Sequence, residues 1–183
     1  VLMQAVALGH TETVTALLAA PGLDVNAVDS RGWTALIMAA GGVHALTVTA
    51  LLATPGIDVN AANRHGYTAL MLAAAGGHTE TTETITALLA APGINMNAAT
   101  GDGHTALMRA AAGGHTETVT ALLAAPGLNL NAVNGRSDTA LMLAAAGGHA
   151  ETVTALLAAP GLDVNAVDGA GYTALIWAAS GGY

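Results

Sequence analysis

The sequence contains no cysteine, no lysine and no phenylalanine, and aromatic residues make up only 3% of its 183 residues. Without cysteine the chain forms no disulfide bond and no thiolate metal site, and it has no cysteine nucleophile. This absence favours a reducing, intracellular (cytoplasmic) location. Hydrophobic residues nevertheless reach 53%, mainly Ala, Leu, Val and Met, so we expect closely packed helices with small side chains.

Positive charge is also scarce. Four arginines stand against 12 acidic residues, for a formal charge of −8. A nucleic acid would be repelled by such a surface, so no nucleic-acid binding is expected. Gly, Pro, Asn or His interrupts every apolar run before the roughly 18 residues that span a bilayer, so no membrane segment is expected. The first ten residues, VLMQAVALGH, lack the basic region and cleavage site of a signal peptide.

What is present is repetition. The tripeptide TAL that follows each D-x-x-G-x-type stretch recurs with differences of 34, 37, 34 and 34, and the Pro-Gly dipeptide keeps the same period. The first residues of these tripeptides are Thr34, Thr68, Thr105, Thr139 and Thr173. Self-similarity at this period predicts stacked repeats. The long unit duplicates TET within HTETTETITALLAAPG at 78–93, which predicts a longer loop or one extra turn at the start of that helix.

Each repeat holds two helical patterns and an extended finger. The first helix begins after a capping Thr and ends at a Gly pair, as in TALMLAAAGG at 68–77. The second opens with His and Thr, carries an acid such as Glu12 near its N-terminus, and is ended by Pro. An extended run follows, such as LDVNAVDSRGW at 23–33, whose tip is rich in turn formers. No element buries its apolar face alone, so neighbouring units must stack.

The composite pattern resembles the ankyrin repeat, in which a finger ending in D-x-x-G-x precedes T-P-L-H-x-A-A, G-H, a helix with L-L, and D-V-N-A. Here DSRGW stands at 29–33, TALIMAA at 34–40 and DVNA at 58–61. The resemblance covers the whole chain and implies an α-helical repeat solenoid, an ankyrin-type stack of helix-turn-helix units with short β-hairpin fingers. It divides residues 1–183 into partial repeats at 1–33 and 173–183 and full repeats at 34–67, 68–104, 105–138 and 139–172.

Two departures from the family pattern and one match to it carry expectations. The His of the family's P-L-H is replaced by Ile or Met (Ile37, Met71, Met108, Met142 and Ile176), so stacking should depend on apolar packing. Ser137 and Asp138 stand where another finger has Gly66 and Tyr67, so that turn is expected to be distorted or less stable. The finger asparagines match a position that is hydroxylated in some members of the family, although their default role is structural. They are Asn26, Asn60, Asn97, Asn131 and Asn165.

The residues present do not support several chemical sites that single motifs suggest. Five histidines recur once per unit, but equivalent positions should lie about 8 to 10 Å apart, too far to share one zinc ion, so hydrogen bonding at the helix junction is the better interpretation. They are His10, His44, His78, His115 and His149. The finger lacks the ligands of a calcium loop, the Gly pairs lack a following Lys, and no Ser lies in a catalytic motif. We therefore expect no metal, no cofactor and no enzymatic activity.

Positions that vary between units are the candidates for recognition. They lie at the finger tips and in one column of the first helices, where Met38, Leu72, Arg109, Leu143 and Trp177 are equivalent. In the ankyrin family these elements line the concave face that binds partner proteins. We name the candidate residues the finger–helix face: Arg31, Trp33, Met38, Arg64, His65, Tyr67, Asp102, His104, Arg109, Arg136, Asp138, Tyr172 and Trp177. Unit-to-unit drift at exposed positions is the alternative explanation.

The sequence thus predicts a non-catalytic protein-binding scaffold, with Trp33, Tyr67, Arg64 and Arg109 as anchors and an acidic background that steers basic partners. A second hypothesis is a structural spacer or positioning arm of a longer protein whose active domain lies outside this sequence. The chain begins and stops inside a unit and shows no polar capping repeat, so self-association through uncapped ends is also expected.

Overall fold

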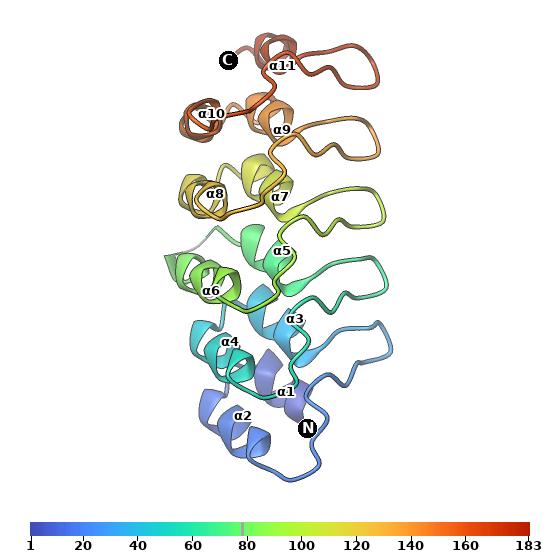
Figure 1. The fold of residues 1–183 in the computed structure, drawn as a ribbon, viewed down its shortest axis with the longest axis vertical. Coiled ribbons are helices and arrows are strands. Elements are labelled where there is room, and N and C mark those ends of the chain that lie inside the picture. Colours follow the sequence, from blue (N-terminus) through green and yellow to red (C-terminus); the bar gives the residue numbers. More distant parts are fainter. Residues whose placement is uncertain (78) are drawn as a thin grey trace. The chain divides into compact units, whose positions relative to one another are not determined.

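The structure is a computed structural model that describes residues 1–77 and 79–183, and of residues 79 and 80 only the backbone. The described residues form two compact units, Val1–Asn95 (unit 1) and Met96–Tyr183 (unit 2). Each unit consists of helix pairs joined by long loops, as Figure 1 shows.

The described residues contain eleven helices. Those of unit 1 are α1 (Leu2–Ala7), α2 (Thr11–Leu18), α3 (Ala35–Gly41), α4 (Ala45–Leu52), α5 (Ala69–Ala74) and α6 (Thr79–Leu89). Those of unit 2 are α7 (Ala106–Ala112), α8 (Thr116–Leu123), α9 (Ala140–Ala146), α10 (Ala150–Leu157) and α11 (Ala174–Gly181). Odd-numbered helices are the first helices of the repeats and even-numbered helices the second.

A threonine caps every first helix that follows a finger. The Thr34 hydroxyl oxygen accepts a hydrogen bond from the backbone N–H of Ile37 at 3.2 Å, which satisfies one of the unpaired amides of the first turn. The same bond is formed at Thr68, Thr105, Thr139 and Thr173. The prediction that the TAL threonines begin these helices is therefore confirmed, and each cap contributes about 1 kcal/mol.

The duplicated TET is accommodated as an extra turn of helix. Helix α6 has 11 residues, whereas α2, α4, α8 and α10 have 8 each. The three additional residues thus extend the helix and do not form a loop, which is one of the two outcomes that the sequence predicts. His78, at the entrance to this helix, lies outside the described residues.

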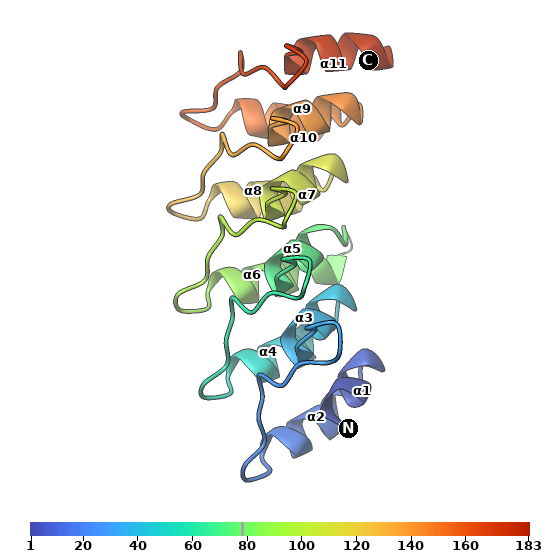
Figure 2. The same ribbon diagram turned by 90° about the vertical axis from the view of Figure 1, so that its right-hand side faces the viewer.

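The helices of each unit form two layers. In unit 1 the first helices α1, α3 and α5 pack in sequence order, and the second helices α2, α4 and α6 pack alongside them. In unit 2 the same order is seen for α7, α9 and α11 and for α8 and α10. Figure 2 shows the helix pairs of each unit side by side with their connecting loops. Each pair covers an apolar face of its neighbour, as the repeat pattern predicts.

The core of each unit is almost wholly aliphatic. In unit 1 it contains Leu36, Leu51, Leu70, Ile85 and Leu88, all at most 1% exposed. The residues that replace the family's His are buried in four of the five repeats, with Ile37, Met71 and Met108 at 1% and Met142 at 2%. Apolar stacking is therefore confirmed at these four. Ile176 on α11 is 41% exposed, because no described helix packs on that side of α11.

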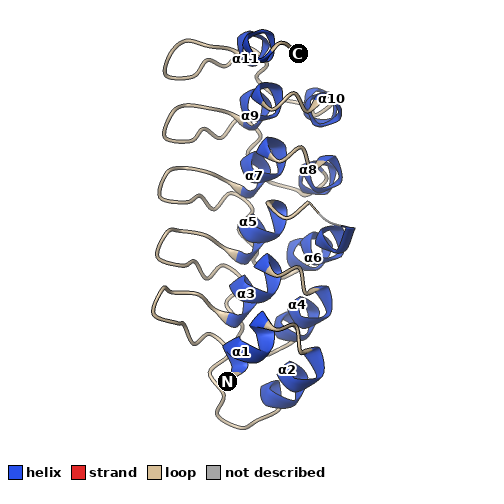
Figure 3. Ribbon diagram, turned by 180° about the vertical axis from the view of Figure 1, so that it is seen from behind, coloured by secondary structure: helices blue, strands red, loops and turns tan. Residues whose placement is uncertain are grey.

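The fingers are hairpin-shaped loops without paired strands. In one of them the Asn63 N–H donates to the Tyr67 carbonyl oxygen at 3.0 Å, and the Gly66 N–H donates to the backbone carbonyl oxygen of Asn63 at 2.9 Å. The described residues hold no β-sheet, and one isolated bridge joins Ala62 to Thr68. Figure 3 accordingly draws the fingers as loops. The sequence predicts the position of the fingers correctly but overstates their strand content.

The finger that contains Ser137 keeps the geometry of the others. Asn134 N–H donates to the Asp138 carbonyl at 3.1 Å, and Ser137 N–H donates to Asn134 at 2.9 Å, as at 63–67. The expected distortion is therefore wrong. The replacement of glycine instead strains the backbone, because Ser137 adopts a left-handed φ of 66° that is unfavourable for a residue with a Cβ atom.

Among the described residues, no helix has the length and apolar character required to cross a membrane.

Candidate functional site

The finger tips are tied to one another through their backbones within each unit. In unit 1 the Arg64 N–H donates to the Arg31 carbonyl oxygen at 3.2 Å. In unit 2 the Gly135 N–H donates to the backbone carbonyl oxygen of Asp102 at 2.8 Å, and the Gly169 N–H donates to that of Arg136 at 2.9 Å. These bonds fix the backbone of each tip against the next tip of the same unit, so the varied side chains project from a backbone of defined position.

Unit 1 has a cleft of about 500 Å³ beside its first helices. Arg31, Trp33 and Met38 line it together with Leu72 from the next first helix. The Arg31 guanidinium carbon lies 5.7 Å from the centroid of the Trp33 ring, within the range of a cation–π contact. Its Nε atom also lies 3.4 Å from Asp29 Oδ2. Three residues of one tip therefore form a cluster at the edge of the cleft.

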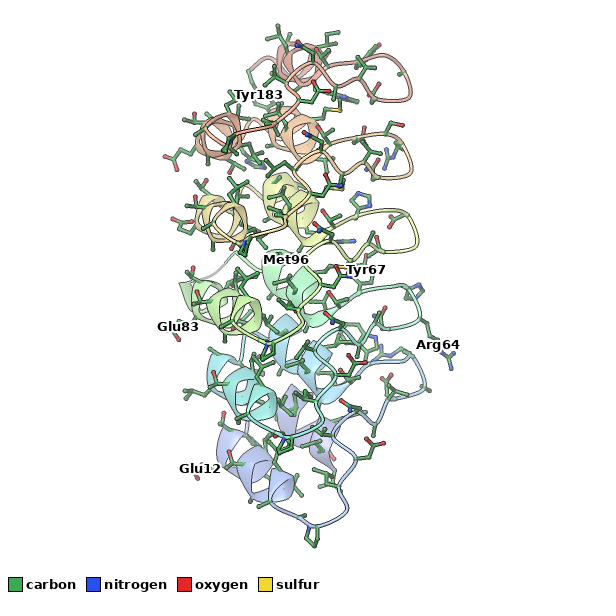
Figure 4. All side chains as sticks on the ribbon, viewed as in Figure 1. Glu12, Arg64, Tyr67, Glu83, Met96 and Tyr183 are labelled. Atoms are coloured by element: carbon green, nitrogen blue, oxygen red, sulfur yellow. The ribbon has the colours of Figure 1, made fainter. Side chains whose placement is uncertain are left out.

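The next finger tip in unit 1 carries Arg64, His65 and Tyr67. Asn63 holds this tip in shape, because its Oδ1 atom accepts hydrogen bonds from the backbone N–H groups of His65 at 2.9 Å and Tyr67 at 3.0 Å. Figure 4 shows Arg64 pointing away from the helices, on the side opposite Glu12 and Glu83 of the second helices. Arg64 is exposed and Tyr67 is half-buried, so both are accessible to a partner.

Unit 2 has a cleft of about 490 Å³ that is lined by His104, Arg136, Asp138 and Trp177. Asn134 connects two of them: its Nδ2 atom donates to Asp138 Oδ2 at 3.0 Å and lies 3.3 Å from His104 Nε2. Asp138 is only 8% exposed. This network joins two successive finger tips through side chains as well as through the backbone.

The last finger contributes a carboxylate and two aromatic rings to the same region of unit 2. The Trp177 indole N–H donates to Asp168 Oδ2 at 3.0 Å, and the other oxygen of Asp168 accepts the backbone N–H groups of Ala170 and Tyr172, each at 2.8 Å. The Tyr172 and Trp177 rings meet edge to face with centroids 5.7 Å apart. Asp168 therefore orients Trp177 and shapes its own finger.

Three carboxyl groups at the tips are stabilised as carboxylates. The backbone N–H of Trp33 lowers the pKa of Asp29, and that of Tyr172 lowers the pKa of Asp168. The Thr100 hydroxyl, with a further contribution from His104, lowers the pKa of Asp102. Donors that point at a carboxylate favour its charged form. The tips therefore carry fixed negative charge near neutral pH, between exposed arginines.

The structure brings part of the finger–helix face together in each unit. Arg31, Trp33 and Met38 meet at the cleft of unit 1, whereas Arg64, His65 and Tyr67 stand on a tip outside its lining. Four members line the cleft of unit 2. Asp102, Arg109 and Tyr172 lie outside that lining, with Arg109 half-buried on α7 and Asp102 and Tyr172 exposed.

Three residues outside the predicted set complete the clefts. Leu72 and Leu143 belong to the varied first-helix column and line the two clefts, but they are not in the predicted set. Asp168 is the more important omission. Its signal is its place as the first residue of the tip, equivalent to Asp29, where the other fingers carry Asn or Thr.

The histidine that recurs once per repeat has a structural explanation at His149. Its Nε2 atom lies 3.0 Å from the carbonyl oxygen of Ala112 in the preceding repeat, which confirms the predicted helix-junction hydrogen bond at this position. His10, His44, His115 and His149 all occupy the N-cap positions of second helices. In the part of the chain that the structure describes, no three His, Asp or Glu side chains are grouped to hold a metal ion.

A third cleft, of about 460 Å³, lies among α9, α10 and α11 of unit 2 and is almost entirely apolar. Leu157, Leu175 and Tyr183 line it, and they are 52%, 78% and 69% exposed. Leu141, the equivalent of Leu175 in the preceding repeat, is only 4% exposed. The self-association that the sequence predicts through the uncapped ends would use apolar surface of this kind, and it stays a prediction.

Comparison with known proteins agrees with this architecture. A family model for ankyrin repeats in three copies matches residues 2–100, 80–168 and 126–183. The chain is also similar to a solved structure, the crystal structure of EF0377, an ankyrin repeat protein. The TM-score is 0.89 and the sequence identity 28%, over 100% of this chain and 92% of that chain. No curated protein matches the chain.

The chain therefore belongs to the ankyrin repeat family. The predicted fold class, a helical repeat solenoid of ankyrin type, is confirmed. Ankyrin repeats are generally protein–protein interaction modules and are typically non-catalytic. The repeat boundaries derived from the sequence stay a prediction.

Proposed function

We propose that this chain binds a partner protein through the finger–helix face, with Trp33, Arg64, Tyr67 and Arg109 as the main anchors. One observation carries the proposal. Side chains that pack repeat against repeat are nearly identical in every copy, whereas the tips and the first-helix column differ, and some of these varied residues line clefts. A surface that only held the stack together would not need Trp, Tyr and Arg at its varied positions.

The residue types at these positions suit recognition. Trp, Tyr and Arg are the residues most enriched in binding hot spots, because each combines a large contact area with a directional polar group. The tips hold their shape through backbone hydrogen bonds such as that from Arg64 N–H to the Arg31 carbonyl. A partner would therefore meet a preorganised surface, which lowers the entropy lost on binding.

The charges favour a basic partner that approaches from solution. The net charge is −8, and Glu12, Glu117 and Glu151 are exposed on the second helices. Long-range attraction of a basic protein raises its association rate, and short-range contacts at the tips then determine which partner stays bound.

The test is the combined change of Arg64, Tyr67 and Arg109 to Ala. Capture of the partner from an extract of the native host should be lost, with affinity reduced about 100-fold or more if two or three of these residues are hot spots. Circular dichroism should show unchanged helicity.

The matched control changes Glu12, Glu117 and Glu151 to Ala, three exposed residues on the second helices. This variant should still capture the same protein, with a slower association because part of the steering charge is lost. If the first variant captures the partner as well as the unmodified chain does, the finger–helix face is not the binding surface.

A further inference from the structure

One finger of unit 1 shows how this chain holds an arginine side chain. Arg31 Nε lies 3.4 Å from Asp29 Oδ2, and its guanidinium carbon lies 5.7 Å from the centroid of the Trp33 ring. A carboxylate at the first position of the tip and an aromatic ring four residues later therefore hold one guanidinium group between them.

The last finger of unit 2 has the same parts except the arginine. Asp168 and Tyr172 are equivalent to Asp29 and Trp33, and Ala170 stands at the place of Arg31. The backbone role of the carboxylate is unchanged. Asp168 Oδ1 accepts the N–H groups at positions 170 and 172 at 2.8 Å, as Asp29 Oδ1 accepts those at 31 and 33 at 2.8 and 2.9 Å. This tip thus has the carboxylate and the ring but no guanidinium of its own.

The cleft beside this tip adds a second carboxylate and a second aromatic ring. Asp138 and Asp168 both line it, and each is 8% exposed. Asp138 Oδ2 accepts the Asn134 amide, and no described residue donates to its Oδ1. Trp177 also lines the cleft, oriented by its bond to Asp168. Two carboxylates and an indole therefore face one volume of about 490 Å³.

We propose that this cleft binds the guanidinium group of an arginine side chain of the partner protein, between the carboxylates of Asp138 and Asp168 and against Trp177. The inference rests on the proposed function and names the group that the unit 2 part of the face recognises. Arginine suits the cleft better than lysine. Its planar guanidinium stacks on aromatic rings, is weakly hydrated, and offers several donors to two carboxylates at once.

Two other titratable side chains border the cleft, Arg136 and His104. Arg136 is exposed, so water and salt screen its charge, whereas the nearly buried carboxylates of Asp138 and Asp168 are screened less. His104 is paired with Asp102, with Nδ1 lying 3.2 Å from Asp102 Oδ2. The potential inside the cleft is therefore dominated by its two acids.

The experiment uses the full chain and a short probe, the peptide acetyl-Gly-Arg-Gly-amide, with the citrulline peptide as its uncharged isostere. The chain has two tryptophans, Trp33 and Trp177, so the two indole N–H signals in an NMR titration report on the two clefts separately. The arginine peptide should shift the Trp177 signal saturably and leave Trp33 nearly unchanged, because Arg31 already occupies the Trp33 ring. The citrulline peptide should shift neither.

Three variants sharpen the test. Asp138→Asn should weaken binding of the arginine peptide about tenfold or more, because a charge-assisted hydrogen bond is lost. Asp163→Asn removes the same charge from an exposed position of unit 2 outside the cleft and should leave the affinity unchanged. Ala170→Arg supplies an arginine from the chain itself and should abolish the response of Trp177.

Equal binding of the citrulline peptide, equal shifts at both tryptophans, or unaltered binding by Asp138→Asn or Ala170→Arg would overturn the proposal. Such a result would leave the proposed function standing, because partner capture is tested with residues outside this cleft. Conversely, loss of the proposed partner-binding function would not alter how the peptide titrates Trp177.

Discussion

The side-chain amide of Asn60 joins two repeats of unit 1, because Nδ2 donates a hydrogen bond to the carbonyl oxygen of Gly93 at 2.8 Å. The Oδ1 atom of the same amide accepts the backbone N–H of Asn95 at 2.7 Å. Asn26 makes the equivalent pair of bonds in unit 1, and Asn97 and Asn131 do so in unit 2. The repeated asparagine thus has a structural role in four of the five fingers, which accounts for its presence there.

Replacement of Asn60 by Ala should destabilise the protein by about 1–2 kcal/mol, since two hydrogen bonds of about 1 kcal/mol each are lost. Urea denaturation measures the change in the free energy of unfolding. The control is Asn165→Ala, because no described residue bonds to the Asn165 side chain; its effect should stay within about 0.5 kcal/mol. Equal effects of the two changes would show that the bridge contributes nothing. Intact-mass measurement on protein from the native host separately tests the hydroxylation hypothesis, and the absence of an added oxygen would exclude it.

The packing of His149 on the preceding repeat predicts a difference between two glycines of unit 2. Gly114 and Gly127 both have a left-handed φ, of 69° and 83°. A Cβ atom on Gly114 would lie 2.5 Å from the His149 ring, whereas one on Gly127 would have nothing within 4 Å. Gly127→Ala should therefore cost about 1 kcal/mol, from the backbone alone.

Gly114→Ala should lower the free energy of unfolding by about 2–3 kcal/mol, because the His149 ring must also move away from Ala112. The comparison requires only urea denaturation of the two single variants, with far-UV circular dichroism to confirm that both fold. If Gly114→Ala were no more costly than Gly127→Ala, the histidine would not be a packing element of the repeat junction.

Ser137 offers a stabilising change. Its φ of 66° costs about 1 kcal/mol that glycine avoids, partly offset by the greater flexibility of glycine in the unfolded chain. Ser137→Gly should therefore raise the stability by about 0.5 kcal/mol and the Tm by about 1–2 °C. The reverse change at the equivalent position of unit 1, Gly66→Ser, should lower both. Differential scanning calorimetry measures the two variants, and a lower Tm for Ser137→Gly would contradict the explanation.

Acid should destabilise the fingers. The pKa values of Asp29, Asp102 and Asp168 are lowered in the folded state from an ordinary value of 3.8, so the unfolded state binds protons more readily. Their stabilising contribution is complete above that ordinary value and is lost as the pH falls through the lowered values. The Tm should be level between about pH 7 and 5 and fall below about pH 4.

Melting temperatures of the Asp168→Asn variant, measured as a function of pH, isolate the contribution of one of the three carboxyl groups to acid sensitivity. Asparagine retains an oxygen that can accept the Ala170 and Tyr172 N–H groups but cannot be titrated. Melting temperatures at pH 7, 5, 4 and 3 should show a lower Tm at neutral pH and a shallower decline in acid than in the unmodified chain. An unchanged decline would mean that Asp168 does not contribute to acid sensitivity.

Much of the fold could be predicted because its signals are local and repeated. Thr34 caps a helix through an atom of its own repeat, and the second TET lengthens α6 because its residues are helix-compatible. The Ser137 finger could not be predicted in the same way. Its turn keeps its shape because Asn134 holds the backbone of Ser137 and Asp138 through several bonds, which sequence comparison of one position does not show.

The candidate site, too, could be predicted only in part. The varied positions are visible in the sequence, because repetition makes every exception conspicuous. That Asp168 would hold Trp177, or that Asn134 would lie between His104 and Asp138, could not be predicted, because these atoms meet only after a finger has folded against a helix or another finger.

By itself, the amino-acid sequence determined the period of the repeats, the ends of most helices and the positions that vary, since all three follow from residues close together in the chain. Only the tertiary structure decided which varied side chains share a cleft and which are engaged elsewhere. The physical reason is that hydrogen bonds, ring contacts and burial depend on distances in space. Positions that are equivalent in sequence, such as Arg31 and Ala170, acquire their chemistry from different neighbours.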